Sequence, residues 1–210
     1  MAAARTNSNS SPPPVECTLC TDLVDPDTTG TRLQCGHTWH ALCITELFER
    51  ATVDETLFPP RCCQEIAFAD VQHVLSPELR LKFTAKSIEF RTLHRVYCSL
   101  ATCARFLGAQ TTQPAAMRCQ ACSTMTCSAC KRSHPIEPGV TCKQSLEDMM
   151  MAEFAKAQGW MRCPKCSRVV ERSSGCNLMT CVCRHQFCYQ CGVYYPPNGR
   201  TCKCPNHHFP

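Results

Sequence analysis

Residues 163–191 read CPKCSRVVERSSGCNLMTCVCRHQFCYQC, and seven of these 29 residues are cysteine. Six of the seven form three closely spaced pairs: Cys163 with Cys166, Cys181 with Cys183, and Cys188 with Cys191. A short loop between two cysteines brings both sulfurs to one metal ion, and zinc takes four Cys or His ligands in a tetrahedron. Cys176 lies alone between the first and second pairs. The stretch therefore predicts a zinc module that carries one cysteine in excess.

The whole chain is rich in cysteine, which accounts for 22 of its 210 residues. This density is typical either of a secreted disulfide scaffold or of a set of zinc modules. Residues 1–14 (MAAARTNSNSSPPP) lack the apolar run of a signal peptide, and we expect them to form a disordered leader. The sequence also lacks an apolar stretch of about 18 residues that could span a membrane. We therefore expect an intracellular protein, cytoplasmic and/or nuclear, whose reduced cysteines bind metal.

The basic charge of the chain does not predict a nucleic-acid partner. The formal net charge of +5 becomes −4 if 21 thiolates bind six Zn²⁺ ions, because 21 negative charges outweigh 12 positive ones. No run of five Lys or Arg residues occurs, so nucleic acid is not an expected partner. Aromatic residues make up only 7% of the chain, which favours small modules held together by metal over one large apolar core.

Cysteine and histidine form three clusters of candidate zinc ligands. The first consists of Cys17, Cys20, Cys35, His37, His40, Cys43, Cys62 and Cys63; the second of Cys98, Cys103, Cys119, Cys122, Cys127, Cys130, His134 and Cys142; the third of Cys163, Cys166, Cys181, Cys183, Cys188, Cys191, Cys202 and Cys204. These 24 ligands complete six zinc sites, and Cys176 is left over. Two alternatives stay open. First, adjacent Cys62 and Cys63 chelate one metal awkwardly. Second, Cys176 could be a ligand if a terminal residue such as Cys204 were spare, and His207 or His208 could also replace a C-terminal cysteine ligand.

The order of these clusters resembles that of the RING-between-RING ubiquitin-protein ligases, over about residues 15–204. The resemblance implies small zinc-stabilised α+β modules: a cross-brace RING, then two sequential zinc-ribbon-like modules, each with two zinc ions, joined by helical linkers. In the cross-brace, Cys17, Cys20, His40 and Cys43 hold one zinc, while Cys35, His37, Cys62 and Cys63 hold the other. In the in-between-RING module, one zinc is held by Cys98, Cys103, Cys119 and Cys122, and the other by Cys127, Cys130, His134 and Cys142.

We expect seven segments along the chain. They are a leader (1–14), a first RING domain (15–66), a helical linker (67–95), an in-between-RING module (96–142), a second helical linker (143–159), a second RING-like catalytic module (160–206) and a tail (207–210). Ser76 is a good N-cap before Pro77, and Leu79, Phe83 and Leu93 mark a helix of about sixteen residues. Residues 143–158 also favour helix, with Gly159 as its stop and Met149, Met150 and Met151 as packing residues.

The resemblance implies that a ubiquitin-conjugating enzyme docks on the first module and that Cys176 accepts its ubiquitin as a thioester. The ubiquitin then passes to a lysine of a protein substrate. By position, the candidate docking residues are Leu19, Trp39, Pro59 and Pro60. A thiolate suits this relay because it is nucleophilic and its thioester stays reactive.

Two residues depart from the family pattern near Cys176. Members commonly carry a histidine two residues after the nucleophile and a glutamate that orients it, whereas this chain has Leu178 and Gln186. Neither side chain can take a proton from an attacking amine. We therefore expect normal loading of Cys176 but slow discharge to lysine, unless nearby His185 acts as the base. This departure also favours an alternative function, that of a non-catalytic or weakly active adaptor for conjugating enzymes.

A zinc-based reader of nucleic acid or histone tails is disfavoured, because basic patches with interleaved aromatics are absent.

Overall fold

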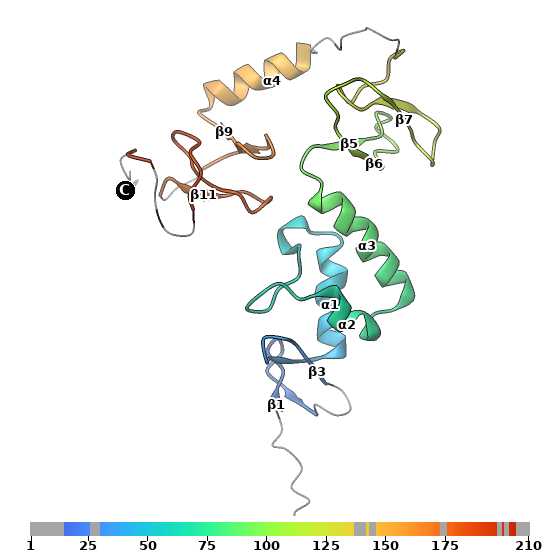
Figure 1. The fold of residues 1–210 in the computed structure, drawn as a ribbon, viewed down its shortest axis with the longest axis vertical. Helices are drawn as coiled ribbons and strands as arrows, with labels where there is room; N and C mark the ends of the chain where they lie inside the picture. The colour runs from blue at the N-terminus through green and yellow to red at the C-terminus, as the bar shows by residue number, and fades with distance from the viewer. Residues whose placement is uncertain are drawn as a thin grey trace, which may run out of the picture. The chain divides into compact units, whose positions relative to one another are not determined.

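The computed structural model describes residues 15–25, 30–136, 142, 146–172, 176–196, 199 and 202–204 (Figure 1). The predicted leader and tail, together with His207 and His208, lie outside these residues. The described chain divides into two compact units, residues 1–87 and 88–210. No described helix is long and apolar enough to cross a membrane.

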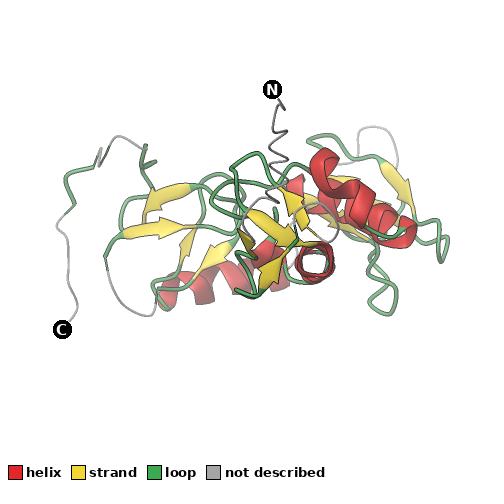
Figure 2. Cartoon of the chain, turned by 90° about the horizontal axis from the view of Figure 1, so that it is seen from below, coloured by secondary structure: helices red, strands yellow, loops and turns green. Residues whose placement is uncertain are grey.

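The described strands are short and pair as antiparallel hairpins rather than as one large sheet (Figure 2). The pairs are β1 (Val15–Glu16) with β2 (Leu23–Val24), β3 (Gly30–Arg32) with β4 (Thr38–His40), β5 (Arg95–Tyr97) with β6 (Phe106–Ala109), β7 (Ala116–Arg118) with β8 (Met125–Cys127), β9 (Met161–Arg162) with β10 (Val169–Val170), and β11 (Leu178–Thr180) with β12 (Gln186–Cys188). A two-stranded hairpin is only marginally stable in water. The predicted class of small modules stabilised by zinc is therefore confirmed by both the fold and its clustered ligands.

The first unit has an aromatic core between its helices. These helices are α1 (Ala41–Ala51), α2 (Phe68–Val71) and α3 (Pro77–Arg91), together with short 3₁₀ turns at Glu55–Leu57 and Gln72–Val74. The ring of Phe83 lies 4.7 Å from Phe48, 5.3 Å from Phe68 and 5.8 Å from Phe58, measured between centroids. Since tilted and stacked rings at such distances attract one another, the four rings fix α3 against α1.

Both predicted helices are present. The backbone N–H of Leu79 donates to the side-chain oxygen of Ser76 at 3.2 Å, which confirms Ser76 as the N-cap of α3. Leu93 was predicted to extend this helix, but α3 ends at Arg91 and Leu93 is exposed. The second helix, α4 (Leu146–Ala157), is followed by Gly159 at φ +68°, a left-handed conformation that glycine adopts without strain.

The prediction that Met149, Met150 and Met151 pack into a core is wrong. Their side chains are 48%, 60% and 54% exposed, and Phe154 on the next turn is also exposed. Ala155 is the buried residue of α4 among those described. Phe154 meets Trp160 edge to face at 5.5 Å between ring centroids, but the three methionines stay largely in solvent.

Candidate metal centres and the Cys176 site

The structure gathers the predicted ligands into groups of four whose donor atoms all lie within 4.8 Å of one another. Five of these groups are Cys17, Cys20, His40 and Cys43; Cys35, His37, Cys62 and Cys63; Cys98, Cys103, Cys119 and Cys122; Cys127, Cys130, His134 and Cys142; and Cys163, Cys166, Cys181 and Cys183. The first two groups interleave along the chain, as in a cross-brace, and the next three follow one another. Adjacent Cys62 and Cys63 both reach the second group, despite the awkward chelation that their adjacency suggested.

The remaining cysteines of the third cluster also converge. The pKa of Cys204 is raised to about 12, first by the thiol of Cys191 and then by burial and the thiols of Cys202 and Cys188. Burial and the neighbouring thiols of Cys202 and Cys191 likewise raise the pKa of Cys188. These four sulfurs therefore face one another as a further group.

Distances between sulfurs within the groups match a zinc tetrahedron. The Zn–S bond length of about 2.3 Å places two ligands of one ion roughly 3.8 Å apart. The sulfur–sulfur distances are 3.5 Å for Cys98–Cys122, 3.6 Å for Cys103–Cys119, 3.6 Å for Cys127–Cys142, 3.7 Å for Cys163–Cys183 and 3.6 Å for Cys166–Cys181. The donor sets thus fit zinc in size as well as in chemistry.

Every C-x₂-C pair sits in the same tight turn. The residue after the second cysteine has a positive φ, and its N–H donates to the carbonyl of the first cysteine at 2.8–2.9 Å: Thr21 to Cys17, Ser123 to Cys119, Lys131 to Cys127, Ser167 to Cys163 and Gly192 to Cys188. Four of these five residues are not glycine, so they adopt a conformation that side chains disfavour. The turn aims both sulfurs at one point, and metal binding can compensate for the local strain.

Two of the predicted histidine ligands are oriented by their second ring nitrogen. His134 presents Nε2 to Cys130 at 3.1 Å, while its Nδ1 lies 2.7 Å from the carbonyl of Pro135. His40 presents Nδ1 to Cys20 at 3.3 Å, and its Nε2 lies 3.3 Å from the carbonyl of Leu23. A ring N–H donated to a carbonyl fixes the tautomer and leaves the other nitrogen free to bind metal.

Crowding of thiols shifts their pKa values in opposite directions within a group. The backbone N–H and the ring of His37 lower the pKa of Cys35 to about 6. In the same group, the thiol of Cys35, followed by burial, raises the pKa of Cys63. One thiolate thus opposes ionisation of the next. A divalent cation removes this conflict because it binds all its ligands in deprotonated form.

Cys176 lies outside all the groups described above. It immediately precedes Asn177 and strand β11, and its side chain is exposed. Its Sγ lies 3.9 Å from the carbonyl oxygen of Leu178. An exposed thiol outside the described groups is accessible to reagents in solvent.

The residue after Cys176 is anchored from three sides. The side chain of Asn177 is only 2% exposed, accepts a hydrogen bond from Arg172 and lies 3.4 Å from the side-chain oxygen of Gln190. Its carbonyl accepts the N–H of Tyr189 at 2.7 Å, and the guanidinium of Arg172 lies over the ring of Tyr189. Sequence reasoning missed this anchor, which holds the backbone next to Cys176 in place.

The hairpin register separates His185 from Leu178 and Gln186. Leu178 pairs with Cys188, and Thr180 pairs with Gln186, so Leu178 and Gln186 share one face of the hairpin. Gln186 reaches Thr180 on that face at 3.5 Å. The ring of His185 instead stacks on Phe187 and Tyr194, which belong to the opposite face. His185 is therefore not placed to act as a base from the Leu178 position.

The four predicted docking residues differ in exposure. Trp39 is 4% exposed and Pro60 is fully buried, so these two side chains pack inside the first unit rather than face a partner. Pro59 is half-buried, whereas Leu19 is 49% exposed. Sequence reasoning missed Leu42, which is 82% exposed beside the ligand Cys43.

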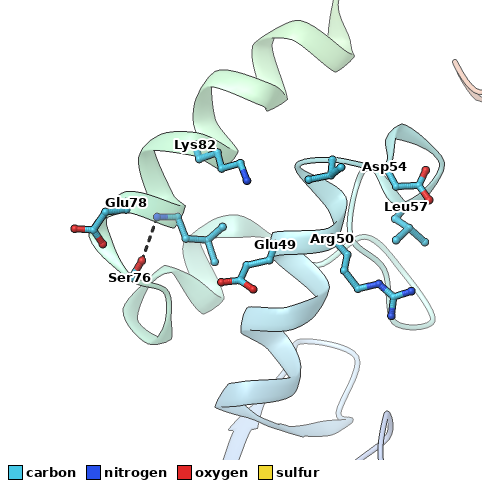
Figure 3. A pocket seen from close by; sticks show the side chains of 9 residues that line it. Glu49, Arg50, Asp54, Leu57, Ser76, Glu78 and Lys82 are labelled. Atoms are coloured by element: carbon cyan, nitrogen blue, oxygen red, sulfur yellow. Dashed lines mark hydrogen bonds between the residues drawn. The ribbon is translucent and has the colours of Figure 1, made fainter.

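A pocket of the first unit lies between α1, the following turn and α3 (Figure 3). Its wall combines acidic, basic and apolar side chains: Glu49, Arg50, Val53, Asp54, Leu57, Ser76, Glu78, Leu79 and Lys82. None of these is a cysteine or a histidine. The pocket therefore supplies neither a thiol nor an imidazole.

Comparison with known proteins agrees with the order of the ligand groups. Residues 144–204 match the family model described as "IBR domain, a half RING-finger domain". The chain is 28% identical over 204 residues to the human E3 ubiquitin-protein ligase RNF144A, covering 85% of this chain and 68% of that protein. These similarities support the resemblance to the RING-between-RING ubiquitin ligases. The matched residues contain the third ligand cluster and Cys176.

Two further similarities are more limited. The chain is 29% identical over 195 residues to the Arabidopsis thaliana protein named ATP-dependent RNA helicase DEAH12, covering 84% of this chain but only 11% of that protein. The structure of Pediculus humanus Parkin bound to phospho-ubiquitin aligns at 18% identity with a TM-score of 0.39, over 88% of this chain and 65% of that one. The chain thus spans a small part of the helicase relative and about two thirds of the length of the other two proteins.

Proposed function

We propose that this chain is a ubiquitin-protein ligase in which Cys176 accepts ubiquitin from a conjugating enzyme and passes it to a lysine. The observation that carries the proposal is an exposed thiol outside every described metal group, in a chain that resembles the RING-between-RING ligases. Relatives named as E3 ubiquitin-protein ligases support it. The relay would operate inside the cell, where thiols stay reduced.

The relay consists of two acyl transfers. First, the Cys176 thiolate attacks the thioester carbonyl on the conjugating enzyme, a new C–S bond forms, and the conjugating enzyme's thiolate leaves. Second, a lysine amine attacks the Cys176 thioester, an amide bond forms, the amine loses a proton, and the Cys176 thiolate leaves. Thiolates serve well in both roles because they are good nucleophiles and good leaving groups.

Each module has a proposed role. Residues 15–66 dock the conjugating enzyme, with Leu19 and Leu42 as the exposed apolar contacts that flank the first metal group. Residues 96–142 form the in-between-RING module, and residues 160–206 carry Cys176. Apolar residues at the centre of an interface contribute much of its binding energy.

We further propose that six zinc ions hold these modules together. The ligands are the five groups named above together with Cys188, Cys191, Cys202 and Cys204. Zinc supplies folding free energy that such small hairpins lack. It contributes structure and not the reaction, because each group already fills its four positions with protein ligands.

The environment of Cys176 supports loading more strongly than discharge. Thiol–thioester exchange needs only the thiolate, whereas aminolysis needs a base for the attacking amine. Leu178 and Gln186 occupy the positions of the usual helpers, and His185 lies on the opposite face of the hairpin. The same observation favours a second candidate function, an adaptor that binds conjugating enzymes and transfers ubiquitin slowly or not at all.

A trapping experiment separates the ligase from the adaptor. We expect the Cys176→Ser variant, mixed with ubiquitin-charged conjugating enzyme, to form a ubiquitin oxyester that resists thiol reductant and is cleaved by mild base. The parent chain should form a thioester that the reductant cleaves. Peptide mass spectrometry would place both adducts at residue 176. If neither protein carries ubiquitin there while both still bind the conjugating enzyme, the adaptor function is correct.

A further inference from the structure

The metal group of Cys35, His37, Cys62 and Cys63 is less buried than the others. Each other group described above contains at least one buried cysteine, whereas here Cys35 and Cys62 are half-buried and Cys63 and His37 are exposed. Solvent-borne reagents therefore have access to its sulfurs. We propose that this group is a modification site for hydroperoxides, which oxidise Cys63 and Cys35 to a disulfide and release the zinc ion.

The local backbone presents the two adjacent cysteines to solvent. Arg61 and Glu65 form an antiparallel bridge, and the N–H of Cys62 donates to the carbonyl of Gln64 at 3.0 Å. Cys62 and Cys63 thus sit at the tip of a tight, largely exposed loop. Residues 61–65 contribute no buried side chain, so solvent has access to the loop.

Geometry selects Cys35 and Cys63 as the pair. Neighbouring Cα atoms lie about 3.8 Å apart, whereas disulfides usually need about 4.4–6.8 Å, so a bond between adjacent Cys62 and Cys63 is strained. Cys35 comes from a different part of the chain, and its sulfur lies within 4.8 Å of both others. Of those two, Cys63 is exposed and Cys62 is half-buried. The oxidant therefore meets Cys63 first, and Cys35 completes the bond.

The reaction balances with a hydroperoxide as the sole oxidant. The Cys63 thiolate attacks one peroxide oxygen, the O–O bond breaks, and a sulfenic acid and hydroxide form when the reagent is hydrogen peroxide. The Cys35 thiolate then attacks the sulfenic sulfur, the S–S bond forms, and a second hydroxide leaves. Two thiolates lose two electrons in total, and the peroxide gains them. The zinc ion loses two of its four ligands and dissociates.

The test measures which zinc leaves first. The zinc-loaded chain carrying Cys176→Ser, which removes the lone reactive thiol, is titrated with hydrogen peroxide while a chromophoric chelator reports released zinc. Free thiols are then alkylated, and the chain is digested after Lys and Arg without reduction. Cleavage yields residues 33–50, with Cys35 and Cys43, and residues 62–80, with Cys62 and Cys63. Fragmentation of the linked peptides assigns the bonded sulfurs.

We expect one linked 33–50/62–80 peptide for each zinc ion released in the first phase, with the bond at Cys35 and Cys63. The cysteines of the other groups should still be alkylated at that stage. The proposal is overturned if the first zinc leaves with oxidation of another group, or if all zincs leave together without this link.

Cys63→His provides a matched control. Histidine can bind zinc but cannot form a disulfide. This variant should keep its zinc through the first phase and give no linked peptide. If it loses zinc as readily as the parent, Cys63 is not the reactive residue. Should it fail to fold, the order of zinc loss in the parent chain decides the question alone.

Discussion

Replacing Cys176 by alanine is expected to abolish ubiquitin transfer while leaving the metal content unchanged. Removal of a covalent nucleophile commonly costs a factor of ~10³ or more in rate, because the two-step route has no substitute. Cys176 lies outside the described metal groups, so its loss should not release zinc or unfold the third module. Transfer is measured as polyubiquitin or free-lysine product per time, and zinc by elemental analysis of the purified chain.

Cys181→Ala is the informative comparison for that variant. Cys181 is buried in the group with Cys163, Cys166 and Cys183, and its sulfur lies 3.6 Å from that of Cys166. Its loss should remove a zinc ion and unfold the core around Phe187, so both activity and zinc content fall. If Cys176→Ala retains near-parent activity, or if it too loses a zinc, Cys176 is not the acceptor proposed here.

Restoring the two missing helpers is expected to accelerate discharge. In the double variant Leu178→His and Gln186→Glu, the new side chains lie diagonally across one face of the β11–β12 hairpin. Diagonal neighbours are about 7–8 Å apart, within reach of long side chains, so the carboxylate can orient the imidazole. A general base typically contributes ~10²–10⁴ in rate. We expect discharge of the Cys176 thioester to free lysine to rise within this range, with little change in loading.

Single-turnover kinetics separate the two steps of that experiment. Loading is followed from charged conjugating enzyme, and discharge from the isolated thioester after lysine is added. His185→Ala in the parent chain is the control, and it should leave discharge unchanged because the His185 ring stacks on Tyr194 at 5.2 Å on the other face. Discharge that is already fast in the parent and falls in His185→Ala would contradict the account.

The pairing of cysteines that lie close in sequence could be predicted because chelation is a local constraint, whereas the assignment of distant pairs to one group came from the family resemblance. The short loop of a C-x₂-C pair points both sulfurs at one metal. The positive φ of the residue after each pair follows from that geometry. Thr21, Ser123, Lys131 and Ser167 carry no sequence signal for a positive φ, since glycine is the usual marker. Their conformation is imposed by the turn.

Tertiary context decided the features that the sequence did not predict. Met149, Met150 and Met151 have the composition of a packing helix, but α4 finds little to pack against among the described residues. Trp39 and Pro60 have the position of docking residues, yet both are buried. The orientation of His185 depends on the register of β11 with β12, which a single sequence does not specify.

The most direct measurement of the central claim combines zinc counting with thiol labelling of the native chain. One equivalent of iodoacetamide is added, and the intact mass is recorded under conditions that keep metals bound, followed by peptide mapping. The account predicts six zinc ions per chain and a single alkylated residue, Cys176. A protected Cys176 together with a labelled Cys204 would show that Cys176 is a metal ligand, and the account would then be wrong.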